Sequence, residues 1–220
     1  MRQEVKYFLS LVENNEDYEF LKEISKYYVR GNKDIFTFIF IKNNSVIKYY
    51  HRTMDPERRF WCHRFYLWKD IKLTCSCGGS IEEIIKKEIH YLRKLQKYKF
   101  FHKIEKESIN NNYIIMEYCG KDFGTKKNTG RTIEIPNDFR EQIKEISDIF
   151  DKENIKHNDL NMANICMIGK TLKIIDFGCV QRLNEFNKYS SAKEFPTNFV
   201  ALNNLFDEYI KVYKKRIKFI

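Results

Sequence analysis

The chain has 220 residues, of which 43% are hydrophobic and 15% aromatic, and its formal net charge at pH 7 is +10. This composition excludes an intrinsically disordered chain, which would be poorer in apolar and aromatic residues, and it suffices for one or two packed domains. The positive charge predicts attraction to an acidic partner. Nucleotide phosphates, nucleic acid, acidic protein segments and anionic lipid all qualify.

No stretch of the sequence resembles a membrane span or a secretory signal. The longest mainly apolar run, residues 35–41, is far shorter than the roughly 20 residues that a transmembrane helix needs. Residues 1–6 lack the basic-then-apolar layout of a signal peptide. The six cysteines are scattered rather than set in a dense disulfide framework. We therefore expect an intracellular, cytoplasmic protein with reduced thiols and no transmembrane segment.

The first part of the chain predicts two short helices and then an antiparallel meander. Residues 5–28 place apolar side chains at helical spacing, with a break near Asn14 and Asn15. The next stretches are rich in aromatic and β-branched residues and are separated by turn-prone sequences, which is typical of hairpin-connected strands. These expected strands are 27–30, 35–41 and 45–50. Residues 51–79 show no clear periodicity.

A longer helix is predicted to begin after Ser80. Ser80 followed by Glu83 has the sequence of a capping box, in which each side chain satisfies a backbone N–H of the first turn. Glu88 lies within the apolar stripe of this helix, and a buried carboxylate needs a partner because burying it unpaired is costly. The stripe consists of Ile81, Ile84, Ile85, Leu92 and Leu95.

The second part of the chain predicts two more strands and then mostly helices. A turn-prone triplet of asparagines, 110–112, separates the two strands. A basic amphipathic helix is expected to begin near Asn198. The expected elements are strands at 100–106 and 113–117, a loop region at 120–136, a helix at 138–151 and a loop–strand–loop segment at 155–190.

Two short motifs carry the chemical information. Residues 157–164 read HNDLNMAN and residues 175–178 read IDFG. Together they resemble the catalytic loop and the metal-binding D-F-G of the protein-kinase superfamily. The apolar runs between them can form a hairpin that returns the chain to the same site. A purely structural alternative is that these polar residues cap turns and lie on solvated loops.

The resemblance implies a role for each polar residue of these motifs. Asp159 would accept the proton of the attacking hydroxyl group. Asn164 and Asp176 would hold Mg²⁺, which prefers oxygen ligands and neutralises charge on the phosphates of ATP. The implied catalytic residues are thus Asp159, Asn164 and Asp176, and the implied cofactors are ATP and Mg²⁺.

The resemblance extends upstream to the residues that hold a nucleotide. Residues 46–48, Val46-Ile47-Lys48, resemble the V-A-I-K strand, so Lys48 would hold phosphates and Glu88 would brace Lys48. Lys69 or Lys72, which are nearer to Glu88 in sequence, are alternatives to Lys48. Residues 113–120 resemble the hinge between kinase lobes. The resemblance therefore implies a nucleotide pocket that includes Gly31, Val46, the gatekeeper Met116, and the backbone of Glu117 and Cys119.

The sequence departs from the kinase pattern at several positions. Only Gly31 stands where a glycine-rich phosphate loop is expected. Asn158 replaces the usual arginine, so we expect no need for a phosphorylated activation loop. Asn161 replaces the lysine that commonly assists the transferred phosphate. Only 42 residues follow Gly178, which implies a truncated second lobe, with Asn198 in place of an anchoring aspartate.

We therefore expect a two-lobed α+β fold of protein-kinase type. Residues 1–119 would form the small lobe, with an N-terminal helical extension and an insertion at about 49–80. Residues 120–220 would form a truncated, mainly helical lobe with a basic C-terminal helix. The short second lobe is similar to small atypical kinases, including bacterial effector kinases, the kinase of the tRNA threonylcarbamoylation complex and kinase-like proteins of large DNA viruses.

The preferred function is transfer of the γ-phosphate of ATP to a protein serine or threonine, with a requirement for an activating partner left open. A small-molecule phosphotransferase and a pseudokinase that regulates a partner are the two rivals. The basic tail, 211–218, is expected to dock on the lobe with a solvated face, and contact with nucleic acid or acidic lipid is its alternative. Cys62, His63, Cys75 and Cys77 also offer an irregular zinc-ligand set, for which unliganded side chains are the alternative.

Overall fold

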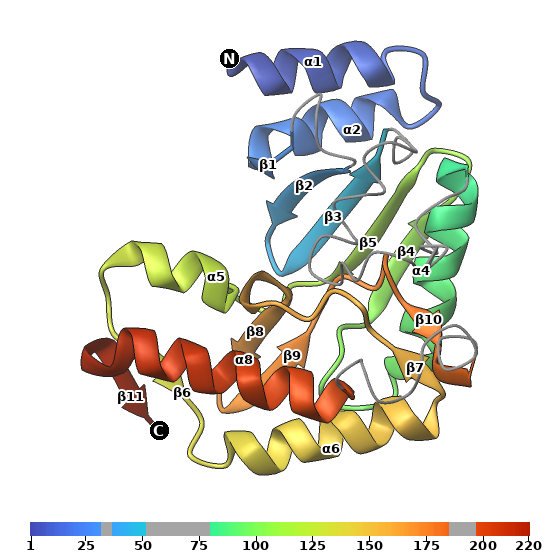
Figure 1. Ribbon diagram of the computed structural model, residues 1–220. Coiled ribbons are helices and arrows are strands. Elements are labelled where there is room, and N and C mark those ends of the chain that lie inside the picture. Colours follow the sequence, from blue (N-terminus) through green and yellow to red (C-terminus); the bar gives the residue numbers. More distant parts are fainter. Residues whose placement is uncertain (32–36, 52–79, 185–196) are drawn as a thin grey trace, which may run out of the picture.

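The computed structural model describes residues 1–31, 37–51, 80–184 and 197–220. A five-stranded antiparallel sheet forms the upper lobe, and helices with short strand pairs form the lower lobe (Figure 1). This mixed α+β arrangement confirms the expected fold class. None of the helices in the described part has the length and apolar character needed to cross a bilayer.

The elements of the upper lobe follow the predicted order. The sheet order is β1-β2-β3-β5-β4, so the third strand lies at its centre. The bounds are α1 Gln3–Val12, α2 Tyr18–Ile24, β1 Tyr28–Arg30, β2 Thr37–Lys42, β3 Ser45–Tyr50, α4 Ile81–Leu95, β4 Ile104–Ser108 and β5 Tyr113–Glu117, with a 3-10 turn at Ser25–Tyr27.

Strand β3 is buried on both faces of the sheet. Its side chains point alternately to the two faces and belong to two separate hydrophobic clusters. Ile47 and Tyr49 pack with the N-terminal helices α1 and α2 in one hydrophobic cluster. Tyr50, two residues after Lys48, packs with α4 in the other cluster. Because successive side chains of a strand point to opposite faces, Lys48 lies on the α4 side of the sheet. The N-terminal extension therefore covers the face that points away from α4.

Helix α4 begins as its sequence predicts. Ser80 Oγ accepts a hydrogen bond from Glu83 N at 3.2 Å, and the Glu83 carboxylate accepts one from Ser80 N at 2.7 Å. This capping box fixes the start of the helix. Ile85, Leu92 and Leu95 are fully buried, and Glu88 is buried among them. The helical register therefore turns the Glu88 carboxylate inward.

The lower lobe consists of two long helices and short strand pairs. Helix α6 buries Ile143, Ile146 and Phe150, and β8 pairs with β9 as the expected hairpin. The bounds are α5 Phe123–Lys126, β6 Ile133–Ile135, α6 Phe139–Lys152, β7 Ile155–Lys156, β8 Ile165–Ile168, β9 Thr171–Ile174, β10 Gln181–Arg182, α8 Asn198–Tyr213 and β11 Ile217–Phe219, with 3-10 turns at Lys127–Thr129, Met162–Asn164 and Lys214–Arg216.

Two predictions for the middle of the chain were wrong, the start of one strand and the absence of helix and strand from one region. The strand expected at 100–106 begins only at Ile104, because Phe100 and Phe101 are buried in the core between the lobes and Phe101 forms a single bridge to Ile174. The predicted loop at 120–136 contains helix α5 and strand β6. The Asp122 side chain caps α5 by accepting a hydrogen bond from Thr125 N at 2.6 Å.

The basic tail also differs from the expected single helix. Helix α8 ends at Tyr213, and residues 217–219 form β11, which pairs in parallel with β6. The Arg216 guanidinium donates hydrogen bonds to the carbonyl oxygens of Lys127 and Arg131, at 2.8 and 2.7 Å. The tail therefore fastens the segment after α5 to the end of the chain.

A buried carboxylate on the lower lobe pairs with residues at the end of α4 and just after it. Glu153, at the end of α6, is 7% exposed and accepts a hydrogen bond from Tyr98 Oη at 2.6 Å. Lys97 and Lys94 form ion pairs with it at 2.9 and 3.3 Å. The Tyr98 hydrogen bond and the lysine charges lower the pKa of Glu153 to about 2. This ionic contact connects the C-terminal end of α4 to the lower lobe.

Candidate active site

Three charged residues from distant parts of the sequence meet between the lobes. Lys48 Nζ lies 2.9 and 2.8 Å from the two carboxylate oxygens of Glu88. It also lies 2.9 Å from Asp176 Oδ1. The Lys48 side chain is 8% exposed and that of Glu88 is 0% exposed. The structure therefore brings together the expected phosphate-holding lysine, its bracing glutamate and the D-F-G aspartate.

The charges of this cluster hold one another in the ionised form. Burial alone would lower the pKa of Lys48, but the charges of Asp176 and Glu88 outweigh burial and raise it. Burial would raise the pKa of Asp176, but the charge and hydrogen bond of Lys48 lower it to about 2. At neutral pH the cluster therefore presents an ammonium group beside carboxylates.

Tyr50 belongs to the same cluster, although the sequence motifs do not point to it. Its hydroxyl donates a hydrogen bond to Glu88 Oε2 at 2.6 Å, and the side chain is buried. Lys48 Nζ lies 5.2 Å from the centre of the Tyr50 ring. Tyr50 follows Lys48 by two residues on the same face of β3, and this spacing was the available signal. Tyr50 therefore orients the carboxylate that orients Lys48.

Replacing Tyr50 by phenylalanine is expected to destabilise the fold by about 1.5–3 kcal/mol, because a hydrogen bond to a buried charge is lost. We also expect a higher KM for ATP, because Glu88 then holds Lys48 less firmly. Chemical denaturation and steady-state kinetics would measure the two effects. Tyr49→Phe is the matched control, since Tyr49 lies on the opposite face of β3 and should leave the KM for ATP unchanged. Equal KM values for all three proteins would contradict this role.

Asp159 lies in the catalytic loop with its carboxylate held by two amides. Asn161 Nδ2 donates to Asp159 Oδ1 at 2.9 Å, and Asn164 Nδ2 donates to Oδ2 at 2.8 Å. Burial and the nearby charge of Asp176 raise the pKa of Asp159, and the two amide hydrogen bonds oppose that rise. Asn161, which departs from the kinase pattern, therefore fixes the orientation of Asp159.

The loop around Asp159 is anchored on both sides. Asn198 Oδ1 accepts a hydrogen bond from His157 N at 3.3 Å, and Asn198 Nδ2 donates to Ile155 O at 2.8 Å. His157 packs against Phe177 with ring centres 5.1 Å apart, and burial lowers its pKa to about 4. Asn198 thus anchors the loop from the position where the kinase pattern has an aspartate.

Asn158 connects the catalytic loop to the segment after D-F-G. Its Nδ2 donates to Cys179 O at 3.1 Å and to Gln181 Oε1 at 2.9 Å. Its φ angle of 62° lies in the left-handed region, which asparagine tolerates better than most residues. These two bonds involve no charged group, and the expectation that no phosphorylated activation loop is needed stays a prediction.

The oxygen atoms available near Asp159 fit a divalent cation. Asn164 Nδ2 donates to the backbone and the side chain of Asp159, so Asn164 Oδ1 is the amide atom able to act as a ligand. Asp176 has a left-handed φ of 66°, and its carboxylate has lone pairs beyond those that Lys48 uses. Amide and carboxylate oxygens are ligands that Mg²⁺ accepts. Asn164 and Asp176 would therefore hold the metal.

The expected nucleotide pocket is only partly described. Met116 and Cys119 are buried, while Val46 and Glu117 are partly buried around the end of β5. Gly31 has a φ of 142°, and an added Cβ would lie 2.5 Å from the Phe38 ring, so this position requires glycine. Residues 32–36, which follow Gly31 where a phosphate loop is expected, lie outside the described residues.

The other candidate sites fall on undescribed parts of the chain. The alternative lysines, Lys69 and Lys72, and the zinc-ligand set of Cys62, His63, Cys75 and Cys77 lie outside the described residues. Within the described ranges, no group of three or more His, Cys, Asp or Glu side chains could hold a metal. Most of the insertion predicted at about 49–80 also lies outside the described residues, but Tyr49 and Tyr50 belong to β3.

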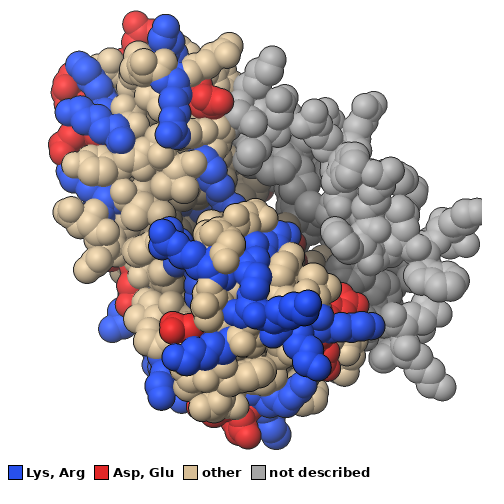
Figure 2. Space-filling view, turned by 90° about the vertical axis from the view of Figure 1, so that its left-hand side faces the viewer, with Lys and Arg blue, Asp and Glu red and all other residues tan. Residues whose placement is uncertain are grey.

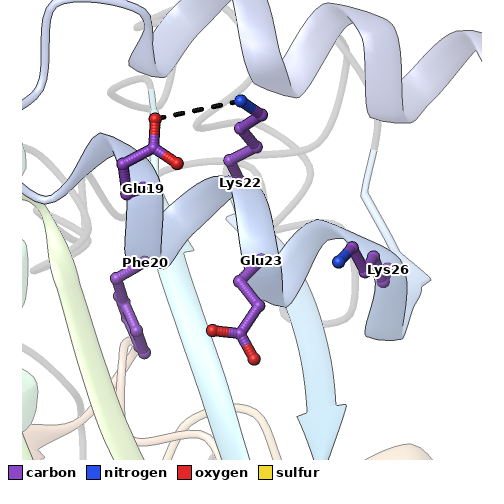
Figure 3. Close-up of a pocket in the computed structure, with 5 residues that line it drawn as sticks. All are labelled: Glu19, Phe20, Lys22, Glu23 and Lys26. Carbon is purple, nitrogen blue, oxygen red and sulfur yellow. Dashed lines mark ion pairs between the residues drawn. The ribbon is translucent and has the colours of Figure 1, made fainter.

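A hollow on the upper lobe is a separate feature. It is lined by Glu19, Phe20, Lys22, Glu23 and Lys26, all from α2 and the turn after it (Figure 3). Lys22 and Glu19 form an exposed ion pair across one turn at 3.8 Å. The hollow includes none of the residues of the catalytic loop, so it is not part of the candidate active site.

The chain matches the family model of the RIO domain over residues 34–195. The matched region includes Lys48, Glu88 and the whole catalytic loop, whereas α1, α2 and α8 lie outside it. No curated protein matches the chain. The narrower resemblance to bacterial effector kinases or viral kinase-like proteins stays a prediction. The chain belongs to the RIO domain family, a group of atypical kinase-like, ATP-binding phosphotransferases.

Proposed function

We propose that this chain transfers the γ-phosphate of ATP to a serine or threonine hydroxyl of a protein. The observation that carries the proposal is the position of Asp159, whose two carboxylate oxygens are held by Asn161 and Asn164. A fixed carboxylate with a raised pKa is suited to accept the proton of an attacking hydroxyl.

The remaining residues are assigned to the nucleotide side of the reaction. Lys48 would bind phosphate oxygens, and its ammonium group is held by the Glu88 carboxylate, which in turn accepts a hydrogen bond from the Tyr50 hydroxyl. Asn164 and Asp176 would hold Mg²⁺, which supplies charge neutralisation for the transferred phosphoryl group. Asn161 offers an amide in place of the usual lysine, so this chain adds less positive charge at the acceptor side. Positioning and charge stabilisation are the main protein contributions to phosphoryl transfer.

The fate of the γ-phosphate tests this proposal. The purified chain would be incubated with γ-labelled ATP, Mg²⁺ and a generic protein acceptor, and the products analysed by phosphopeptide mass spectrometry. We expect phosphoserine or phosphothreonine on the acceptor or on the chain itself. Labelled inorganic phosphate as the sole product would point to ATP hydrolysis, and a labelled small hydroxylated metabolite would point to a small-molecule kinase.

A further inference from the structure

Two basic stretches from different parts of the chain form one surface of the lower lobe. Figure 2 shows Lys and Arg side chains gathered on the face that carries α5 and the C-terminal end of α8 in Figure 1. Residues 121–131 contain four basic residues and one acidic residue, and residues 211–218 contain five basic residues and no acidic one. We call this surface the basic face. It consists of Lys121, Lys126, Lys127, Arg131, Lys211, Lys214, Lys215, Arg216 and Lys218.

The backbone beneath the basic face is held in place by hydrogen bonds. Strand β11 pairs with β6, and Ile220 N donates to Ile135 O at 3.0 Å. The Arg216 guanidinium donates to the carbonyl oxygens of Lys126, Lys127 and Arg131. These contacts bring the two basic stretches together despite their distance in sequence. The positive charges are therefore carried on an ordered scaffold.

Most of these charges lack an ionic partner within the described part of the chain. Seven of the nine side chains are exposed, and none of the nine forms a described ion pair. By contrast, Arg140 on α6 pairs with Asp207 of α8. Clustered charges of one sign without internal partners favour a ligand of the opposite sign.

The basic face adjoins the catalytic loop through α5. A Cβ atom added at Gly124 would lie 3.0 Å from Ala163 Cα, so α5 packs directly on the loop that carries Asp159. Tyr209 Oη donates to Phe123 O at 2.8 Å and ties α8 to the same helix. Helix α5, which carries Lys126 and is followed by Lys127, therefore connects the catalytic loop to the basic face.

We propose that the basic face binds acidic residues of the protein substrate near its acceptor hydroxyl. This inference rests on the proposed function, because it names the substrate class of the same site. A polypeptide is favoured over nucleic acid because the proposed function already places a serine or threonine of a protein beside Asp159, so flanking residues of the same chain are the nearest source of acidic groups. The chain would thus select serine or threonine in segments rich in aspartate and glutamate.

A binding measurement tests the basic face without relying on catalysis. Two fluorescent peptides would share one serine and differ only in flanking residues, glutamate in one and glutamine in the other. We expect the glutamate peptide to bind at least about tenfold tighter at low salt, with the difference shrinking as ionic strength rises. Equal binding of the two peptides would overturn the proposal, and tighter binding of a single-stranded oligonucleotide of equal charge would assign the face to nucleic acid.

Two charge-reversal variants test whether the preference for the glutamate peptide depends on the basic face. The variant Lys127→Glu/Lys214→Glu/Lys215→Glu should lose the preference for the glutamate peptide and bind the glutamine peptide as the wild type does. Lys6→Glu/Lys26→Glu/Lys152→Glu has the same change in net charge at exposed lysines elsewhere and should keep the preference. Loss of the preference in both variants would show a general charge effect and overturn the assignment.

Kinetics separates this proposal from the proposed function. We expect kcat/KM for the glutamate peptide to fall about tenfold or more in the Lys127/Lys214/Lys215 variant, mainly through KM. Phosphorylation of both peptides at equal rates would overturn the basic-face proposal and leave the kinase proposal standing. Preferential binding of the glutamate peptide without any phosphorylation would contradict the kinase proposal while keeping the acidic-ligand site.

Discussion

Asp159→Asn is expected to lower the rate of phosphate transfer by about 10²–10⁴-fold. Asparagine has nearly the same shape as aspartate, but its amide cannot accept the proton of the attacking hydroxyl. The nearby carboxylate of Asp176 is not free for this role, because it is paired with Lys48 and is assigned to the metal. Lys48, Glu88 and Asp176 remain intact in this variant, so the Kd for ATP should stay close to that of the wild type.

The rate and the affinity should be measured on the same preparations. Single-turnover transfer with labelled ATP gives the rate, and calorimetry gives the Kd. Asp148→Asn is a matched control, since Asp148 is an exposed residue of α6 that pairs with Lys144. That control should transfer phosphate as the wild type does. A wild-type rate in Asp159→Asn would remove Asp159 from the reaction.

Lys48→Met is expected to destabilise the fold by about 3–5 kcal/mol, because it leaves the carboxylate of Glu88 buried without a cation. Glu88 is 0% exposed, and among the described residues it would keep only the hydrogen bond from Tyr50. Such a loss is a large fraction of the stability of an ordinary domain, which is about 5–15 kcal/mol. The variant should also lose phosphate transfer, because Lys48 is the assigned phosphate ligand.

The double variant Lys48→Met/Glu88→Leu separates the two consequences. Replacing both members of a buried pair by apolar side chains is often neutral for stability. We therefore expect the double variant to recover most of the unfolding free energy, as measured by chemical denaturation, while phosphate transfer stays lost. A double variant as unstable as Lys48→Met would show that the ion pair is not the source of the instability.

Much of the candidate site could be predicted because its signals are local in sequence. The catalytic loop and the D-F-G segment are short motifs, and the position of Glu88 within an apolar helical stripe predicted that its carboxylate has a partner. The resemblance of Val46-Ile47-Lys48 to the V-A-I-K strand then pointed to Lys48. The structure places the ammonium group of Lys48 between Glu88 and Asp176. Their roles in transfer stay predictions until they are measured.

The features that were missed depend on contacts between distant segments. Strand β6 is only three residues long, and its partner β11, Ile217–Phe219, is far away in the sequence. No local sequence pattern therefore marks β6 as a strand. Phe100 and Phe101 looked like the start of a strand, but they fill the core between the lobes. Tyr50 was not singled out beyond being the last residue of the predicted strand 45–50, because its partner, Glu88, is 38 residues away. Each of these depends on tertiary packing that propensity does not encode.

Lys48, Asp159, Asn164 and Asp176 are proposed to form one metal-dependent phosphotransfer site. The most direct test compares the wild type with Asp176→Ala. Transfer of labelled γ-phosphate to a protein hydroxyl would be measured at saturating ATP, with Mg²⁺ and with a chelator. We expect the wild type to transfer phosphate with Mg²⁺ but not with the chelator, and Asp176→Ala to remain folded but to transfer none under either condition. Equal, Mg²⁺-dependent transfer by both proteins would contradict this proposal.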